Sequence, residues 1–334
     1  MAVTNRVANA TKNFLFPKLV EGVVTGNKVT AMFLKKAKGW AGAQIEIPFK
    51  HATNSNGGSF IGLDTLSTAA VDNTIKLTFE AKFTYQNVTL PKTDLALNDT
   101  PEQVANLLER QVSSDTYDLA LKIATQLYSD GTGNSSKDIT GLAAAVDDGT
   151  SAATYGGQTR ATYTQLNSTV TASSGTLTLA KMYTLFDACA QGSEEPNKIL
   201  TTKAVRSFYN QLLTPSERYT NPDAMGTGAS KLMFRGAPVE ADTACTSGVM
   251  FMLNEDSFDY YAIKKYPNGE AINYAPEMMD GEPDPSVPKG AGFFFGGWTT
   301  PTNQEAVIAK IVHGGNLICK NPRYNGKLTG ITGI

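Results

Sequence analysis

The chain has 334 residues, of which 41% are hydrophobic, and its 29 basic and 31 acidic side chains give a net charge of −2. This length allows about two domains with a substantial core, and no apolar run approaches the ~18 residues of a membrane span. Three widely spaced cysteines exclude a disulfide framework and a cysteine-based zinc site.

The N-terminal segment is strongly basic. Residues 1–50 carry eight basic and two acidic side chains, so the rest of the chain has a net charge of −8. Residues 1–40 mix short apolar clusters with Gly and Lys, which predicts an extended arm with one short helix. Such an arm indicates pairing between copies or weak contact with nucleic acid, and a merely solvated arm is the alternative. The segment Met1–Arg6 lacks the apolar core of a signal peptide, which predicts a cytoplasmic protein.

Two alternating segments predict a β-hairpin over residues 41–90. Apolar and polar side chains alternate from Ile75 to Tyr85, as in a half-buried strand, and a shorter run, Ile45–Phe49, lies upstream. The residues between them, 51–73, are polar and rich in glycine. A hairpin with such an excursion at its tip is better suited to reaching across another subunit than to catalysis.

A long helix is predicted from about residue 101 to 130. Thr100 is a good N-cap, Pro101 fits the first helical position and Gln103 completes a capping box, while Gly131 is placed to end the helix. About thirty residues make a rod of ~45 Å, long enough to span the molecule as a spine. An apolar stripe runs along it: Val104, Leu107, Leu108, Val112, Leu119, Ile123 and Leu127.

The rest of the chain predicts short, mixed elements. Residues 131–176 are rich in Gly, Ser, Thr and Ala and indicate loops. Helices and strands then follow without strict alternation, which favours an α+β fold over a doubly wound sheet. We expect helices at 178–191 and 203–213, and strands at 199–201, 232–234, 249–253, 260–263, 293–295 and 307–312.

The candidate nucleophile and phosphate-binding motifs are weak. His313 and Cys319 are a conceivable catalytic pair, but neither lies in a recognised nucleophile motif, so buried structural side chains are the preferred interpretation. The segment Gly131–Lys137 superficially resembles a phosphate-binding loop. That motif needs Gly before the lysine and Ser or Thr after it, whereas Ser136 and Asp138 occupy these positions.

An acidic segment resembles the start of a calcium-binding loop. Asp280, Glu282 and Asp284 have the spacing of its first ligands, but Pro285 and Ala291 stand where glycine and glutamate are needed. We therefore predict a solvated acidic loop, no metal, no cofactor and no enzymatic activity. These features together favour a structural subunit.

The order of these parts resembles the major capsid proteins of tailed bacteriophages, whose coat fold also occurs in herpesvirus shells and encapsulins. Pro91–Leu95 with the following helix looks like the entry to that family's spine, and Ile139–Leu142 is similar to the Gly-Leu step after it. Lys231–Val239, followed by 249–253 and Asn254–Asp256, resembles a Gly-x-Pro-Val strand and its successor.

The resemblance implies a division of the chain. Residues 1–40 would form the N-terminal arm and 41–90 the long hairpin called the E-loop. Residues 91–137 would form the P-domain with the spine helix, 138–300 the mixed α+β A-domain, and 301–334 the return to the P-domain. Intersubunit contacts are expected on the arm and at the hairpin tip: Lys12, Lys18, Lys35, Lys36, Lys38, Phe60, Ile61 and Leu63.

The resemblance also implies a function and partners. We expect a coat protein that assembles in the host cytoplasm into the virion capsid, as pentamers and hexamers of an icosahedral phage head. Expected partners are a separate scaffolding protein, a portal protein, optional decoration proteins and double-stranded DNA in weak, non-specific contact, without a membrane. Some relatives join an E-loop lysine to a neighbour's asparagine, but residues 52–73 contain no lysine. An encapsulin-like shell with enzyme cargo, and a soluble hydrolase or carbohydrate-binding protein, are the alternatives.

Overall fold

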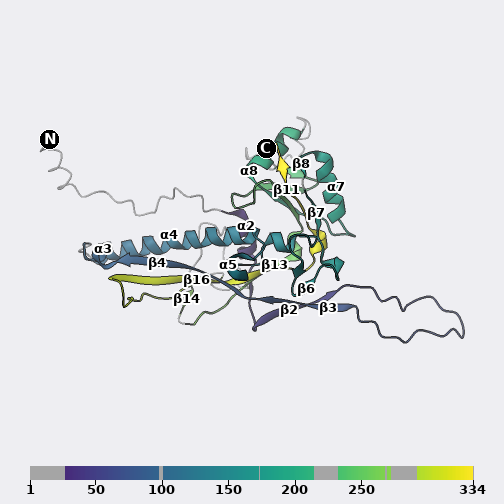
Figure 1. Ribbon diagram of the computed structural model, residues 1–334, viewed down its shortest axis with the longest axis horizontal. Helices are drawn as coiled ribbons and strands as arrows, with labels where there is room; N and C mark the ends of the chain where they lie inside the picture. Colours follow the sequence, from purple (N-terminus) through teal and green to yellow (C-terminus); the bar gives the residue numbers. More distant parts are fainter. Residues whose placement is uncertain are drawn as a thin grey trace.

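Two six-stranded sheets and one long helix organise the molecule (Figure 1). The computed structural model describes residues 27–97, 101–172, 174–213, 232–267, 269–271 and 292–333. The expected N-cap at Thr100, the acidic loop at 280–284 and the first 26 residues lie outside this part of the chain.

The N-terminal part of this region packs into the core. The short helix α2 (Lys28–Lys35) places Val29, Phe33 and Leu34 among the core residues, at 0–4% exposure. Strand β1 (Lys38–Gly39) then pairs in parallel with β13 (Phe258–Ala262). Residues 28–39 are therefore fixed to the body on which any preceding arm would be mounted.

The expected hairpin is present. Strand β2 (Gln44–Lys50) pairs antiparallel with β3 (Thr74–Glu80) along the full length of both strands. The two strands project from the body, and residues 51–73 extend the hairpin further (Figure 1). Leu77 and Phe79 anchor its base in the main core.

The prediction of a single strand from Ile75 to Tyr85 is wrong, because the structure divides this segment into two strands at Ala81. The next strand, β4 (Lys82–Pro91), leaves the hairpin and pairs with β16 (Ala306–Cys319). The break also changes which side chains face inward, since odd-numbered residues are the more buried in β3 and even-numbered residues in β4. Uninterrupted alternation in the sequence therefore concealed a change of partner and face.

The long helix is confirmed as α4, which spans Pro101–Tyr128 and follows a short helix, α3 (Lys92–Leu97). Leu119, Ile123 and Leu127 are completely buried, as the apolar stripe predicted. Helix α4 runs alongside β4 and β16 (Figure 1). Leu119, Ile123 and Leu127 therefore lie in the layer between the helix and the first sheet. The strand order of this sheet is β1-β13-β16-β15-β14, and β4 also pairs with β16.

The strand expected at 307–312 is confirmed but continues to Cys319, through Gly314 and Gly315. A Cβ on Gly314 would lie 2.7 Å from Ile263 Cδ1, and one on Gly315 would lie 2.7 Å from the carbonyl oxygen of Tyr261. The two glycines allow neighbouring chain segments to pack closely against a continuous strand. The sequence had suggested that this strand ends before them. The other strands of this sheet are β15 (Phe293–Phe295) and β14 (Glu270–Ala271).

The second sheet has the order β10-β11-β9-β12-β17-β7 and is accompanied by two expected helices. Helices α7 (Leu179–Cys189) and α8 (Lys203–Leu212) begin at Thr178 and Thr202, whose hydroxyls accept hydrogen bonds from backbone N–H groups three residues ahead. The strands are β7 (Thr169–Thr171), β9 (Lys198–Thr201), β10 (Met233–Phe234), β11 (Ala237–Ala241), β12 (Met250–Leu253) and β17 (Gly326–Leu328).

Short elements fill the connections. Helices α5 (Gly133–Ser136) and α6 (Leu142–Ala145) follow the spine, and two-residue strands form the pairs β5–β6 and β8–β18. The short strands are β5 (Thr154–Tyr155), β6 (Gln158–Thr159), β8 (Gly175–Thr176) and β18 (Ile331–Thr332), and single 3-10 turns lie at Thr164–Leu166, Glu255–Ser257 and Pro322–Tyr324.

Gly141 allows the chain to pass closely over the end of the spine helix. A Cβ at this position would lie 2.4–2.6 Å from the carbonyl oxygens of Gln126, Leu127 and Ser129. We expect Gly141→Ala to destabilise the subunit by about 3 kcal/mol, the upper part of the range for overpacking a rigid site. The midpoint of urea unfolding measures this loss. Gly57→Ala, at a position with no atom within 4 Å, is the control, and equal midpoints for both variants would contradict the assignment.

Candidate functional site: exposed surfaces and their polar anchor

The two residues considered for catalysis do not meet. His313 is completely buried, and its Nε2 lies 2.6 Å from the Tyr260 hydroxyl. Cys319 instead contacts Ser257 and Asn325, and burial raises the pKa of its thiol to about 12. A thiol held in this neutral form is a poor nucleophile. Both side chains therefore belong to the core.

The described part of the chain shows neither a metal site nor a membrane-spanning helix. Over this part of the chain, no group of three or more His, Cys, Asp or Glu side chains has the arrangement of a metal site. Among the helices that the structure places, none is both long and apolar enough to cross a membrane.

The hairpin excursion displays large apolar side chains to solvent. Phe60, Ile61 and Leu63 are 64%, 83% and 104% exposed, and Leu66 and Val71 are also exposed. Few polar contacts hold the segment, among them the hydrogen bond from Asn56 Nδ2 to the carbonyl oxygen of Ala69 at 2.9 Å. Clustered exposed apolar side chains mark interaction sites, so the predicted contact residues at the tip form a candidate docking surface.

A second exposed apolar patch lies on β4 and was missed by the sequence analysis. Phe83 and Tyr85 are 51% and 60% exposed, and the ring of Tyr266 lies near Phe83 at a centroid distance of 6.5 Å. The alternation of the sequence placed these side chains on the buried face with Leu77 and Phe79. The change of face at Ala81 turns them outward instead.

Two of the five basic residues predicted as contacts, Lys36 and Lys38, form ion pairs within the chain. Lys36 Nζ lies 2.9 Å from Glu255, and Lys38 Nζ lies 2.9 Å from Asp259. The hydrogen bond to Asp259 raises the pKa of Lys38. Lys35 is exposed, whereas Lys12 and Lys18 belong to the first 26 residues, outside the described chain. The intersubunit role of all five lysines stays a prediction.

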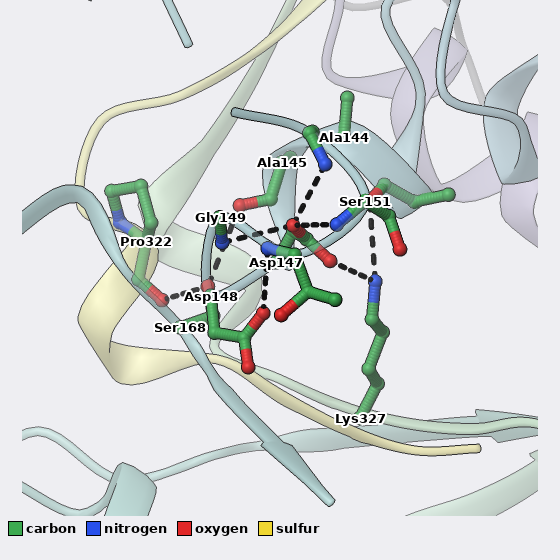
Figure 2. A network of polar contacts seen from close by, with 12 residues as sticks. Ala144, Ala145, Asp147, Asp148, Gly149, Ser151, Ser168, Pro322 and Lys327 are labelled. Carbon is green, nitrogen blue, oxygen red and sulfur yellow. Dashed lines mark hydrogen bonds and ion pairs between the residues drawn. The ribbon is translucent and has the colours of Figure 1, made fainter. Parts of the chain in front are cut away.

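A buried ion pair ties the segment after α6 to the C-terminal strand β17. Lys327 Nζ lies 2.9 Å from Asp147 Oδ1, with the two side chains 8% and 1% exposed. The other carboxylate oxygen accepts hydrogen bonds from the backbone N–H groups of Gly149, Ser151 and Ala152 at 2.9–3.0 Å (Figure 2). Burial alone would raise the pKa of Asp147, but these donors and Lys327 outweigh it and hold the pKa below its ordinary value.

Arg160 adds a second buried cation to this network. It is completely buried, and its guanidinium donates to the backbone carbonyl oxygens of Ala144, Ala145 and Asp147 at the end of α6. Its Cζ lies 5.2 Å from the ring centroid of Tyr155. Free carbonyl groups at a helix end attract a cation. The composition of residues 131–176 suggested only loops, and nothing in that pattern marked Arg160 as the centre of an ordered structure.

The order of these elements matches the coat fold that the resemblance of the sequence implied. The hairpin is its E-loop, α4 its spine helix, and the second sheet with α7 and α8 its mixed α+β A-domain. The α+β coat fold that the sequence predicted is thus confirmed.

Comparison with solved structures gives the same fold. The capsid asymmetric unit of cyanophage A-1(L) superposes with a TM-score of 0.73 at 16% identity, over 99% of this chain and 100% of that one. The capsid of a native GTA particle gives 0.63 at 10% identity, over 99% of both chains. The SrpI encapsulin of Synechococcus elongatus PCC 7942 gives 0.61 at 11% identity, over 99% and 96%. No protein-family model and no curated protein sequence matches the chain.

Proposed function

We propose that this chain is the major coat protein of a tailed-bacteriophage head. In this proposal it assembles without enzymatic activity as pentamers and hexamers into an icosahedral shell that encloses double-stranded DNA. The single observation that carries the proposal is the structural match to a chain of the cyanophage A-1(L) capsid, over 99% of this chain and 100% of that one. The exposed apolar excursion supports it, because such a surface is suited to burial against another copy.

Cohesion in such a shell arises from repetition. Each copy takes part in several interfaces, so contacts that are weak individually become a stable closed assembly through symmetry and multivalency. We propose residues 1–40 as the arm, 41–90 as the E-loop, 91–137 and 301–334 as the P-domain and 138–300 as the A-domain. Strands cross these bounds in both directions: β17 completes the sheet of the A-domain, and β13, β14 and β15 join the sheet beside the spine helix. A separate scaffolding protein, a portal protein and optional decoration proteins complete the proposed set of partners.

Electron microscopy of the purified protein tests the proposal. Negative-stain images should show closed shells of uniform size, and the protein should elute in the void volume of a size-exclusion column. A small soluble oligomer under all assembly conditions would reject a shell protein of any kind.

A cellular compartment of the encapsulin type is the second candidate, supported by the match to the SrpI encapsulin. The material that co-purifies with the shells distinguishes the two. Portal and scaffolding proteins with DNA support a phage head, whereas an enzyme or a cargo peptide supports a compartment.

The hairpin excursion should be cut by protease in free subunits and protected in shells. Its own contacts offer little to offset the entropy of ordering, roughly 1–2 kcal/mol per residue. Chymotrypsin is the suitable probe because Phe60, Leu63 and Leu66 are exposed, while residues 52–73 contain no lysine or arginine for trypsin. Mass spectrometry of the fragments should place the early cuts within 51–73. The same cutting rate in subunits and shells would contradict an intersubunit role.

Mature particles should contain no lysine–asparagine links between subunits. Two lysines at and near the hairpin already have partners within the chain: Lys76 pairs with Glu46 at 2.6 Å, and Lys82 donates a hydrogen bond to the carbonyl oxygen of Ser136 at 2.8 Å. Boiling in SDS should therefore give one band at the chain mass of 35.7 kDa. A ladder of multimers that resists SDS and reductant would defeat this prediction.

A further inference from the structure

We propose that the edge formed by β1, the end of β13 and the end of β16 is the surface that contacts the phosphate backbone of enclosed double-stranded DNA. We call this surface the basic edge, and it rests on the proposed function. It would face the interior of the shell. Five lysines define it: Lys36, Lys38, Lys264, Lys265 and Lys320. For Lys36 and Lys38 this proposal replaces the intersubunit role that the sequence predicted.

The fold places these lysines along one edge of the sheet from distant parts of the chain, with Lys320 beside the start of β13 and Lys264 and Lys265 beyond its end. Strand β1 is an edge strand of the first sheet, and its Lys38 lies opposite Tyr261 of β13. Lys264, just beyond β13, lies across β1, so that a Cβ on Gly39 would be 1.9 Å from Lys264 Cε. Lys320 directly follows β16 and reaches the same carboxylate as Lys38, that of Asp259.

The edge has an excess of positive charge. Asp259 serves two ammonium groups, at 2.9 Å from Lys38 and 3.2 Å from Lys320, and it is itself only 12% exposed. The side chains of Lys38 and Lys320 remain 53% and 41% exposed. Glu255 pairs with Lys36, and Glu80 lines the same hollow as Lys264 and Lys265. The five lysines therefore face three carboxylates, a local net charge of +2 on a chain whose net charge is −2.

The chemistry of this surface fits a phosphate polymer better than a protein. Protein interfaces have an apolar core, and the exposed large apolar side chains of the described chain lie on the hairpin excursion, β4, α7 and β10. The nearest of them is Phe83, which borders the edge beside Lys264 and Lys265. Lysines on flexible stems act as point charges, suited to contacts with phosphates that carry no sequence information.

The charge of this surface would also allow a chain of net negative charge to contact enclosed DNA. Double-stranded DNA carries one negative charge per ~1.7 Å of axis, and each phosphate neutralised by a lysine releases bound counterions. A local excess of lysine gives weak, salt-dependent contact without a binding pocket. The five lysines of the basic edge supply such an excess on one side of the sheet.

The test measures DNA binding by the full-length unassembled subunit. A labelled 30-base-pair duplex of random sequence is titrated at several salt concentrations, with fluorescence anisotropy as the readout. The variant Lys264→Gln/Lys265→Gln removes two charges and leaves the ion pairs of Asp259 and Glu255 intact. The matched control is Lys137→Gln/Lys203→Gln, two exposed lysines elsewhere on the subunit.

We expect the edge variant to bind more weakly and its log–log dependence on salt to become shallower by about 2, close to 0.9 per lost phosphate contact. The control should keep the slope of the unmodified chain. Identical slopes for both variants, or no DNA binding by the unmodified subunit, would overturn the inference. A variant that keeps its DNA affinity but no longer forms shells would assign the edge to a protein contact and also overturn it. Shell formation by the unmodified chain is scored separately by microscopy, so failure of the proposed function is distinguishable.

Discussion

Removal of the Asp147 carboxylate is expected to destabilise the unassembled subunit by about 3–5 kcal/mol, the usual cost of breaking a buried ion pair from one side. In Asp147→Ala, the Lys327 ammonium would stay buried without its counterion, next to a second buried cation, Arg160. Three backbone N–H groups would lose their acceptor at the same time. Urea unfolding followed by circular dichroism measures the loss.

The double variant Asp147→Ala/Lys327→Met separates the two contributions. Replacing both charges leaves no unpaired ammonium, so it should recover part of the lost stability. Lys36→Met breaks an exposed ion pair with Glu255 and is the matched control, with an expected change of at most about 1 kcal/mol. If Asp147→Ala unfolds at the same urea concentration as this control, the polar network of Figure 2 does not stabilise the subunit as proposed.

His313 should make the subunit sensitive to acid. Complete burial lowers its pKa from 6.5 to about 3. The pKa of His313 is lower in the folded chain than in the unfolded one. Above pH 6.5 the side chain is neutral in both states and does not reduce the free energy of unfolding, which then falls as the pH drops from 6.5 towards 3. At pH 4.5 the loss relative to pH 7 is about 3 kcal/mol.

The surroundings of the His313 ring explain this direction. They are the Tyr260 hydroxyl of β13, the Phe293 ring of β15 and Thr84 in the opposite position on β4. None of these groups carries a negative charge that would stabilise an imidazolium. Within the described part of the chain, Nδ1 has no hydrogen-bond partner.

A comparison of variants isolates this effect from the titration of carboxylates. His313→Gln keeps a polar group beside Tyr260 but cannot titrate, so its stability should fall less between pH 7 and pH 4.5 than that of the unmodified chain. His51→Gln, at a half-buried position directly after β2, controls for the loss of a histidine. Parallel stability–pH curves for the His313 variant and the unmodified chain would refute the prediction.

The elements with strong local patterns were predictable from the sequence. Helix α4 has a complete apolar stripe, and β2 and β3 alternate clearly, so each follows from the periodicity of its own residues. What failed was pairing, since β3 and β4 form one uninterrupted pattern although their partners are β2 and β16. A period of two reports alternation only and carries no information about the partner strand.

The polar network was beyond sequence analysis for a related reason. Asp147 is separated from Lys327 by 180 positions, and Arg160 binds backbone carbonyl groups that have no signature in side-chain identity. The candidate contact residues at the hairpin tip could be proposed because they are apolar residues in a polar segment. Phe83 and Tyr85 could not, because their exposure results from the break at Ala81.

The last strands of the chain impose an order on biosynthesis. Strand β16 is the central strand of the first sheet, and β17 lies between β12 and β7 in the second, so residues 306–328 complete both. While this C-terminal segment is still inside the ribosome, β4, β13 and β15 lack the strand they share, and β12 and β7 lack the one between them. The two sheets are therefore completed only after residues 306–328 have left the ribosome. Until then, a nascent chain whose hairpin has already emerged has no completed body to offer a neighbour.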